Sequence, residues 1–214
     1  MKKKWSVKKK IVVTLLSVIA AFLLVVIVYV LYVFGTYHRI KDKQPIEINS
    51  LNATEGSKVK TGVEYTAGTY NVGFGAYTPD YSFFMDGGKY SRCFSRQSGI
   101  DAINGAADYA KSENPDFMIF EEVDRDSTRS YHVNQENLIN KKFQGYFQNF
   151  AVNYDSAYLF YPFNEPIGKS YSGISVCSKY EITSALRRSF PISTSFSKLL
   201  DLDRCYSVSR VPVE

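Results

Sequence analysis

Four acidic residues follow a short apolar segment near the middle of the chain. The segment 117–120 is expected to be a strand buried on both faces, because four apolar residues follow a proline that ends any preceding helix. Carboxylates at the end of such a strand suit a hard cation such as Mg²⁺, which takes one or two protein carboxylates plus substrate phosphate. The alternative is a solvated acidic loop. The acidic residues are Glu121, Glu122, Asp124 and Asp126.

Regular alternation of side chains along a strand limits which carboxylates can act together. Glu121 and Glu122 are adjacent, so we expect them on opposite faces and expect only one of them to be a ligand. A second polar candidate is Asn71, which comes close to the end of the β-prone run 63–73. For Asn71 the alternative is a residue that only forms a turn after the strand.

The elements that must position these residues are a strand, a helix and a second strand. Between the two strands, apolar residues at Ile100, Ile103, Ala107 and Ala110 have helical spacing, which predicts a helix over 96–112 that ends before Asn114-Pro115. A strand–helix–strand unit makes its two strands parallel and brings their carboxyl ends to one edge of the sheet. Ligands of open α/β sheets bind at that edge, so the asparagine and the acidic pair are expected to face each other there.

The rest of the globular part is rich in aromatic residues and short strands. A second helix is expected over 133–143, and the long loop that carries the aromatic cluster at 77–90 is either functional or poorly ordered. Closely spaced strands indicate antiparallel pairing, and therefore a mixed sheet or a sandwich with helices outside. The expected strands are 146–153, 157–161, 173–178, 180–186 and 204–213.

The amino terminus predicts a membrane anchor. Residues 1–10 contain six lysines, and the uncharged run 11–34 is long enough as a helix to cross a hydrocarbon core of about 30 Å. A buried core helix and a cleaved signal peptide are the alternatives; the run is too long for the latter. Because the lysines outweigh the three basic residues after the run, we expect a single-pass protein of the cell membrane with a cytoplasmic amino terminus, an extracellular stalk over 35–62 and an extracellular globular part.

Composition and charge agree with one domain plus an accessory segment in a chain of 214 residues. Residues 1–43 hold nine Lys or Arg and one Asp, a net charge of +8, whereas 44–214 hold 17 basic and 20 acidic residues, a net charge of −3. The globular part therefore has no excess of positive charge for non-specific binding of nucleic acid. Three cysteines allow one internal disulfide, and Cys93–Cys205 is the pairing to consider, since Cys177 lies within an apolar run.

Several segments, in order, resemble the endonuclease/exonuclease/phosphatase superfamily, whose fold is that of the DNase I-like enzymes. Residues 70–73, Tyr-Asn-Val-Gly, resemble its first motif, and residues 115–124 resemble its second, usually Pro-Asp, an apolar run and Gln-Glu-Val. The usual Gln falls on Glu121 and the metal-binding Glu on Glu122. Residues 171–182 resemble a later strand ending in Ser-Lys-Tyr, and 204–212 the strand that pairs with it. The resemblance covers about residues 63–214.

The resemblance implies a metal-dependent phosphoester hydrolase with a DNase I-like four-layer α/β sandwich. Glu122 would hold Mg²⁺ or Mn²⁺, and Asn71 would orient the phosphate or the nucleophile. The substrate would be a nucleic acid, a phospholipid head group or a small phosphoester.

The family's later His, Asp-x-Asn and Ser-Asp-His elements are missing from this sequence. We therefore expect the amino-terminal part of such a domain, over 63–214, with little or no activity alone. Neither His38 nor His132 fits the family's contexts, and His132 is expected at the surface. Arg125 and Arg129 would either bind phosphate or balance nearby acids. The competing function is a catalytically inactive, anchored binding module that holds a carbohydrate or a partner protein with the aromatic loop.

Overall fold

The computed structural model describes residues 5–191, 195 and 202–214. The chain forms two compact units, residues 1–38 and residues 39–214. The first consists of one long helix, α1 (Val7–Thr36), and Ser6 caps it by accepting a hydrogen bond from the backbone N–H of Lys9 at 3.3 Å. This helix is long and apolar enough to cross a membrane, which is consistent with single-pass anchoring. Residues 1–4 of the predicted cytoplasmic tail lie outside the described residues.

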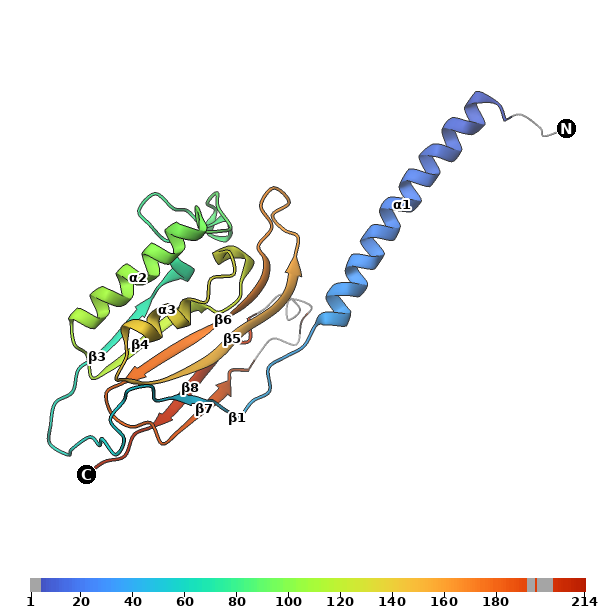
Figure 1. Ribbon diagram of the computed structural model, residues 1–214. Coiled ribbons are helices and arrows are strands. Elements are labelled where there is room, and N and C mark those ends of the chain that lie inside the picture. Colours follow the sequence, from blue (N-terminus) through green and yellow to red (C-terminus); the bar gives the residue numbers. More distant parts are fainter. Residues whose placement is uncertain (1–4, 192–194, 196–201) are drawn as a thin grey trace. The chain divides into compact units, whose positions relative to one another are not determined.

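The second unit is a mixed α/β structure with two sheets in its described part (Figure 1). The five-stranded sheet has the order β2-β5-β6-β4-β3, and the three-stranded sheet has the order β1-β7-β8. In chain order the elements are β1 (Gln44–Pro45), β2 (Ile48–Asn49), β3 (Ala67–Asn71), η1 (Gly73–Gly75), η2 (Phe84–Asp86), α2 (Arg96–Ser112), β4 (Phe117–Asp124), η3 (Thr128–Ser130), α3 (Gln135–Lys142), β5 (Phe147–Leu159), β6 (Gly168–Ser178), β7 (Ser184–Ser189) and β8 (Cys205–Arg210).

The strand–helix–strand prediction is confirmed. β3 and β4 pair in parallel, and α2 connects them over the residues predicted for the helix. Ser95 begins the helix with a capping box in which its side chain and that of Ser98 exchange hydrogen bonds with the backbone. The buried stripe of α2 is Gly99, Ile103, Ala107 and Ala110, which is the apolar face read from the sequence.

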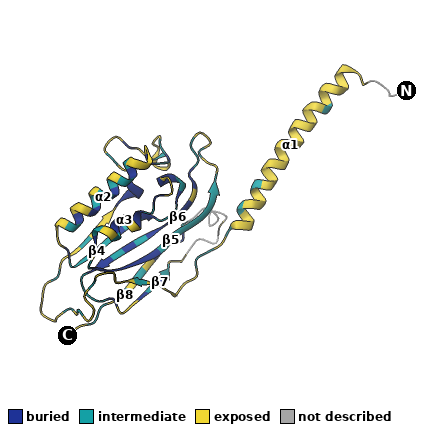
Figure 2. Ribbon diagram, in the orientation of Figure 1, coloured by how far each residue is buried: buried dark blue, intermediate teal, exposed yellow. Residues whose placement is uncertain are grey.

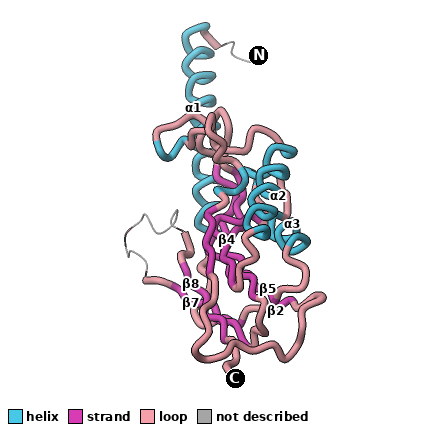
Figure 3. The backbone as a smooth tube through the Cα atoms, turned by 90° about the vertical axis from the view of Figure 1, so that its left-hand side faces the viewer, coloured by secondary structure: helices cyan, strands magenta, loops and turns pink. Residues whose placement is uncertain are grey.

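The helices α2 and α3 lie on the same face of the five-stranded sheet (Figures 1 and 3). Their apolar side chains join those of the sheet in one cluster that includes the fully buried Phe120, Val123, Ile139 and Phe143. Burial of this kind stabilises a fold by about 25 cal/mol per Å² of apolar surface, so this cluster holds β4 against the two helices.

The opposite face of the sheet is covered only in part. The three-stranded sheet packs near β5, where Phe147 meets Ile182 and Ala185, and where Arg187 donates to the carbonyl of Val152 at 2.7 Å. Phe117 and Ile119 of β4 therefore stay half-buried while Met118 and Phe120 are buried against the helices (Figure 2). The expectation that this strand is buried on both faces was wrong, because the second sheet does not reach across it.

Residues from Arg39 to the predicted end of the stalk belong to the globular unit. β1 adds to β7 of the small sheet, and β2 adds to β5 of the large one. Arg39 also pairs with Asp203 at 2.9 Å. The structure thus differs from the stalk expected over 35–62. Strands of two residues have no periodicity to detect, and only their distant partners define them.

The other predicted helix and strands are present, but several begin or end at different residues. The second helix is α3, and the expected strands 146–153 and 157–161 form one long strand, β5. β7 begins later than expected, after the bend at 179–183, and β6 begins earlier, at Gly168. Most strands pair antiparallel, as predicted, and β3–β4 is the parallel pair of the described sheets.

All three cysteines are free and buried, so the considered Cys93–Cys205 disulfide is not formed. Burial raises the pKa of Cys93 and of Cys177 to about 12, and it raises the pKa of Cys205. We expect no thiol to react with Ellman's reagent within minutes at pH 8 in the folded chain, since the thiolate is the nucleophile. In guanidinium chloride three thiols per chain should react. Rapid reaction of one thiol without denaturant would contradict this burial.

Candidate active site

The carboxyl ends of β3 and β4 meet at one edge of the sheet, as expected for a parallel pair. Asn71 lies opposite Glu121 in the register of the two strands. The loop that follows β3 turns back at once, because Gly73, Phe74 and Gly75 all have positive φ, at 49°, 45° and 76°. A side chain at position 75 would lie 2.8 Å from the carbonyl oxygen of Gly99, so this glycine is needed where the loop touches α2.

A β-bulge in β4 decides how the two glutamates point. Pairing with β6 shifts between Phe120 and Val123, and Glu122 has a φ of 55°. Phe120 and Val123 both enter the core under the helices, although in an unbroken strand residues three positions apart would point to opposite faces. Glu121 and Glu122 are therefore both directed away from that core, as the extra residue of a bulge allows.

The expectation that these glutamates lie on opposite faces was wrong, because it assumed an unbroken strand. Glu121 accepts a hydrogen bond from the hydroxyl of Thr69 at 2.5 Å, and Glu122 accepts one from the Nδ2 of Asn71 at 3.1 Å. Thr69 and Asn71 are two residues apart on β3 and so share a face. Both carboxylates thus lie along the same side of this sheet edge.

The predicted proximity of Asn71 and Glu122 is confirmed by this contact. The turn considered as the alternative is also present, since the Oδ1 of Asn71 accepts from the backbone N–H of Gly73 at 2.9 Å. The same side chain therefore fixes the loop with its oxygen and meets the carboxylate with its nitrogen. Asn71 is exposed and Glu122 is half-buried, so both are accessible from solvent.

Beneath the glutamates lies a buried polar network that the sequence did not reveal. Arg129 makes two hydrogen bonds to Asp124, at 2.9 and 3.1 Å, and its guanidinium lies 4.1 Å from the centre of the Phe74 ring. Gln135 accepts from the backbone N–H of Asp124 at 3.0 Å and donates to the carbonyl of Phe74 at 2.7 Å. This network connects β4 to the loop after β3.

Burial would lower the pKa of Arg129, but the pairing with Asp124 and the attraction of Glu122 raise it above its ordinary value. The guanidinium therefore stays charged and contributes a positive field near Glu122. Of the two roles considered for the arginines, balancing acids is the one seen here: Arg129 pairs with Asp124, and Arg125 pairs with Glu136.

The last of the four acidic residues, Asp126, forms exposed ion pairs. It contacts the Nδ1 of His132 at 2.6 Å and the Nζ of Lys169 at 2.6 Å. Hydrogen bonds from Lys169 and His132 lower the pKa of Asp126. The side chain of His132 is 56% exposed, which agrees with the surface position expected for it.

The aromatic loop after β3 is ordered by its own packing. Phe74, Tyr81 and Cys93 are buried in a small cluster, with Phe83 and Tyr90 packed against it. Tyr77 lies at the rim: burial, Asp86 and Glu122 together raise its pKa to about 12. The phenol stays protonated at neutral pH and donates to the Oδ2 of Asp86 at 3.5 Å. Sequence reasoning noted the aromatic cluster but did not place Tyr77 at the site, because only the folded loop brings it there.

The donor set suits a weakly held cation. Among the described residues no group of three or more His, Cys, Asp or Glu side chains could surround a metal. Asp124 is occupied by Arg129, and Asp126 by Lys169 and His132. Glu122, with Glu121 beside it, remains as a candidate ligand for a cation. A Mg²⁺ ion is usually held by one or two protein carboxylates, and water and substrate phosphate complete its coordination.

Comparisons with known proteins do not identify a relative of this chain. No protein-family model, no curated protein and no solved structure matches it.

Proposed function

We propose that the chain is a membrane-anchored phosphoester hydrolase of the endonuclease/exonuclease/phosphatase type, dependent on Mg²⁺ or Mn²⁺. The observation that carries the proposal is the hydrogen bond between Asn71 and Glu122 across the ends of two parallel strands. The resemblance of residues 70–73 and 115–124 to the superfamily motifs places the same two residues in its site. A nucleic acid, a phospholipid head group or a small phosphoester would be the substrate.

The layers of the globular unit also support a DNase I-like sandwich. Helices cover one face of the five-stranded sheet, and a second sheet packs on part of the other. A four-layer sandwich would add helices outside the second sheet. We propose that residues 63–214, together with β1 and β2, belong to this fold.

In the proposed site Glu122 would hold the cation, which offsets negative charge on a phosphate oxygen when it is bound. The Nδ2 of Asn71 points to the same place and would donate a hydrogen bond to a phosphate oxygen or to the attacking water. Arg129 would act at a distance, by keeping a buried positive charge near the site. The phenol of Tyr77, which donates to Asp86 at 3.5 Å, lies at the rim of the site and would meet a phosphate only by giving up that contact.

Activity of residues 1–214 alone is expected to be low. In-line hydrolysis needs a base for the water and an acid or metal for the leaving oxygen. The family's later His, Asp-x-Asn and Ser-Asp-His elements have no counterpart in this sequence. Binding of the cation is therefore a better first readout than turnover.

The proposed location is the cell membrane, with α1 as the single span. Six lysines before the apolar run favour a cytoplasmic amino terminus, which would leave the globular unit outside.

Titration with Mn²⁺, followed by electron paramagnetic resonance, tests the proposed site in the full chain. We expect weak binding that Glu122→Gln weakens about tenfold or more, because the amide lacks the charge of the carboxylate. Glu113→Gln, which changes an exposed glutamate just after α2, is the matched control and should leave binding unchanged. Slow hydrolysis of bis-p-nitrophenyl phosphate, if present, should fall with Glu122→Gln. Equal Mn²⁺ affinity of the Glu122 and Glu113 variants would overturn the proposal.

One observation favours the second candidate function, an inactive binding module. Aromatic side chains from two loops meet, and the ring centres of Phe84 and Tyr161 lie 5.9 Å apart. The neighbouring side chains of Met85 and Phe163 are 69% and 85% exposed. Such a surface would suit a carbohydrate or a partner protein. Binding that survives Glu122→Gln but is lost with Phe163→Ser would favour this function over hydrolysis.

A further inference from the structure

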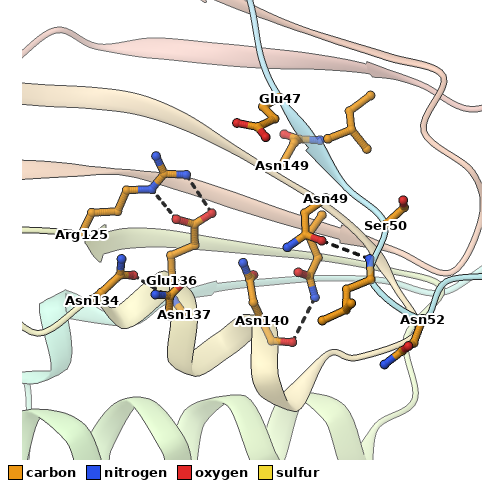
Figure 4. A pocket seen from close by; sticks show the side chains of 13 residues that line it. Glu47, Asn49, Ser50, Asn52, Arg125, Asn134, Glu136, Asn137, Asn140 and Asn149 are labelled. Carbon is orange, nitrogen blue, oxygen red and sulfur yellow. Dashed lines mark hydrogen bonds and ion pairs between the residues drawn. The ribbon is translucent and has the colours of Figure 1, made fainter.

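A polar cavity of about 720 Å³ has a lining that contains neither Asn71 nor Glu122. Its walls are the segment 47–52 around β2, one side of α3 and the first residues of β5, and Arg125 lies at one end (Figure 4). Segments far apart in the sequence thus form one concave surface. Its size falls within the range of about 300–1,000 Å³ that is usual for small-molecule sites.

The lining has an unusual chemistry, because side-chain amides dominate it. Seven of its thirteen residues carry a carboxamide, and Ser50 adds a hydroxyl. A carboxamide offers two donors and one acceptor without a charge. The amide residues are Asn49, Asn52, Asn134, Asn137, Asn140, Gln148 and Asn149.

The positive charge at the cavity is already neutralised. Arg125 donates to both carboxylate oxygens of Glu136, and its guanidinium lies 4.1 Å from the centre of the Phe150 ring. Pairing with Glu136 raises the pKa of Arg125 although burial would lower it. With Glu47 as the other charged residue of the lining, the cavity offers no free cation to a phosphate or a carboxylate.

Two buried acceptors of the lining have no partner among the described residues. They are the Oδ1 atoms of Asn140 and Asn149, and Asn149 as a whole is only 3% exposed. Buried polar atoms in folded proteins are almost always hydrogen-bonded. Each of these oxygens exposes less than 1 Å² to solvent, so a ligand in the cavity reaches it once the amide group turns toward the cavity.

Other amides are used in part. The Oδ1 of Asn134 caps α3 by accepting from the N–H of Asn137 at 2.9 Å, which leaves its Nδ2 for a ligand. The Nε2 of Gln148 donates to the carbonyls of Asn140 and Phe143, and the Nδ2 of Asn149 donates to the hydroxyl of Ser209 at 2.9 Å.

From these observations we infer that the cavity binds a neutral, hydroxyl-rich ligand, namely a short oligosaccharide. Each hydroxyl group both donates and accepts, so it can satisfy an amide oxygen and an amide nitrogen together. The backbone of an extended peptide offers only one donor and one acceptor per residue of about 3.3 Å, whereas every hydroxyl of a sugar ring is both a donor and an acceptor. The lining holds no aromatic ring among the described residues, so recognition rests on hydrogen bonds rather than stacking.

The inference goes beyond the proposed hydrolase, and neither depends on the other. Binding is measured by isothermal titration calorimetry with the full chain in lipid nanodiscs, using lactose, maltotriose, cellotriose and chitotriose as separate probes. At least one should bind, and Asn140→Ala should weaken it about fivefold or more, as expected for one lost hydrogen bond. The matched control is Asn104→Ala, which changes a half-buried asparagine on α2, outside the cavity. Glu122→Gln should also leave the affinity unchanged.

A second variant covers the case that Asn140→Ala does not fold. Asn137 is exposed on α3, where alanine favours the helix, so Asn137→Ala should fold and still weaken binding. No measurable binding of any of the four saccharides overturns the inference. The same holds if both cavity variants bind as tightly as wild type, or if only an extended peptide binds.

Discussion

Replacing Arg129 with leucine is expected to lower the free energy of unfolding of the globular unit by about 3–5 kcal/mol. Its partner Asp124 is fully buried and would be left without a counter-charge in contact. The contact of the guanidinium with Phe74 would be lost as well. Urea unfolding followed by far-ultraviolet circular dichroism measures this change. The dependence of the free energy of unfolding on urea concentration, the m value, should be the same for both proteins.

Two further variants separate the loss of charge pairing from the loss of a large side chain. In the double variant D124L/R129L no charge is left buried, so it should be more stable than R129L alone. Lys169→Leu removes a partner of Asp126 at the surface and should cost at most about 1 kcal/mol. A cost for R129L no greater than that for K169L would show that the buried pair contributes little.

Gly173→Ala is expected to destabilise the unit by about 3 kcal/mol, because the sheet has no room for a side chain there. A Cβ atom at this position would lie 2.3 Å from the carbonyl oxygen of Ala151 and 2.8 Å from ring atoms of Phe150. The oxygen belongs to the backbone of β5, so relief requires β5 and β6 to separate. Gly173 also pairs with Val123 at the end of the bulge, so the change should displace Glu122 and weaken Mn²⁺ binding.

The matched control is Gly105→Ala on the exposed side of α2. Nothing lies within 4 Å of the Cβ atom that this change adds, and alanine is favoured in a helix interior by about 0.5–1 kcal/mol. The two substitutions therefore add the same methyl group with opposite expected signs. Thermal unfolding of both variants decides the question, and equal melting temperatures would refute the close packing of β5 and β6.

Much of the candidate site followed from local patterns. Asn71 and Glu122 were placed together because a helix between two strands forces those strands to be parallel. The pairing of Arg129 with Asp124 and the position of Tyr77 did not follow, since both depend on how the loop after β3 folds onto η3. Glu121 and Glu122 were expected on opposite faces for a related reason: a bulge is one extra residue relative to a partner strand, and β6 lies about fifty residues away in the sequence.

The sequence by itself determined the apolar helix α1, the helix α2 and the parallel pair of β3 and β4. Each depends on contacts between residues close in the chain, or on a run of one residue type, and such patterns can be read directly. Only the tertiary structure decided that residues 44–49 are edge strands of both sheets, that two adjacent glutamates share a face, and that seven amides line one cavity. These features arise from the register and packing of distant segments, which no local period of hydrophobicity encodes.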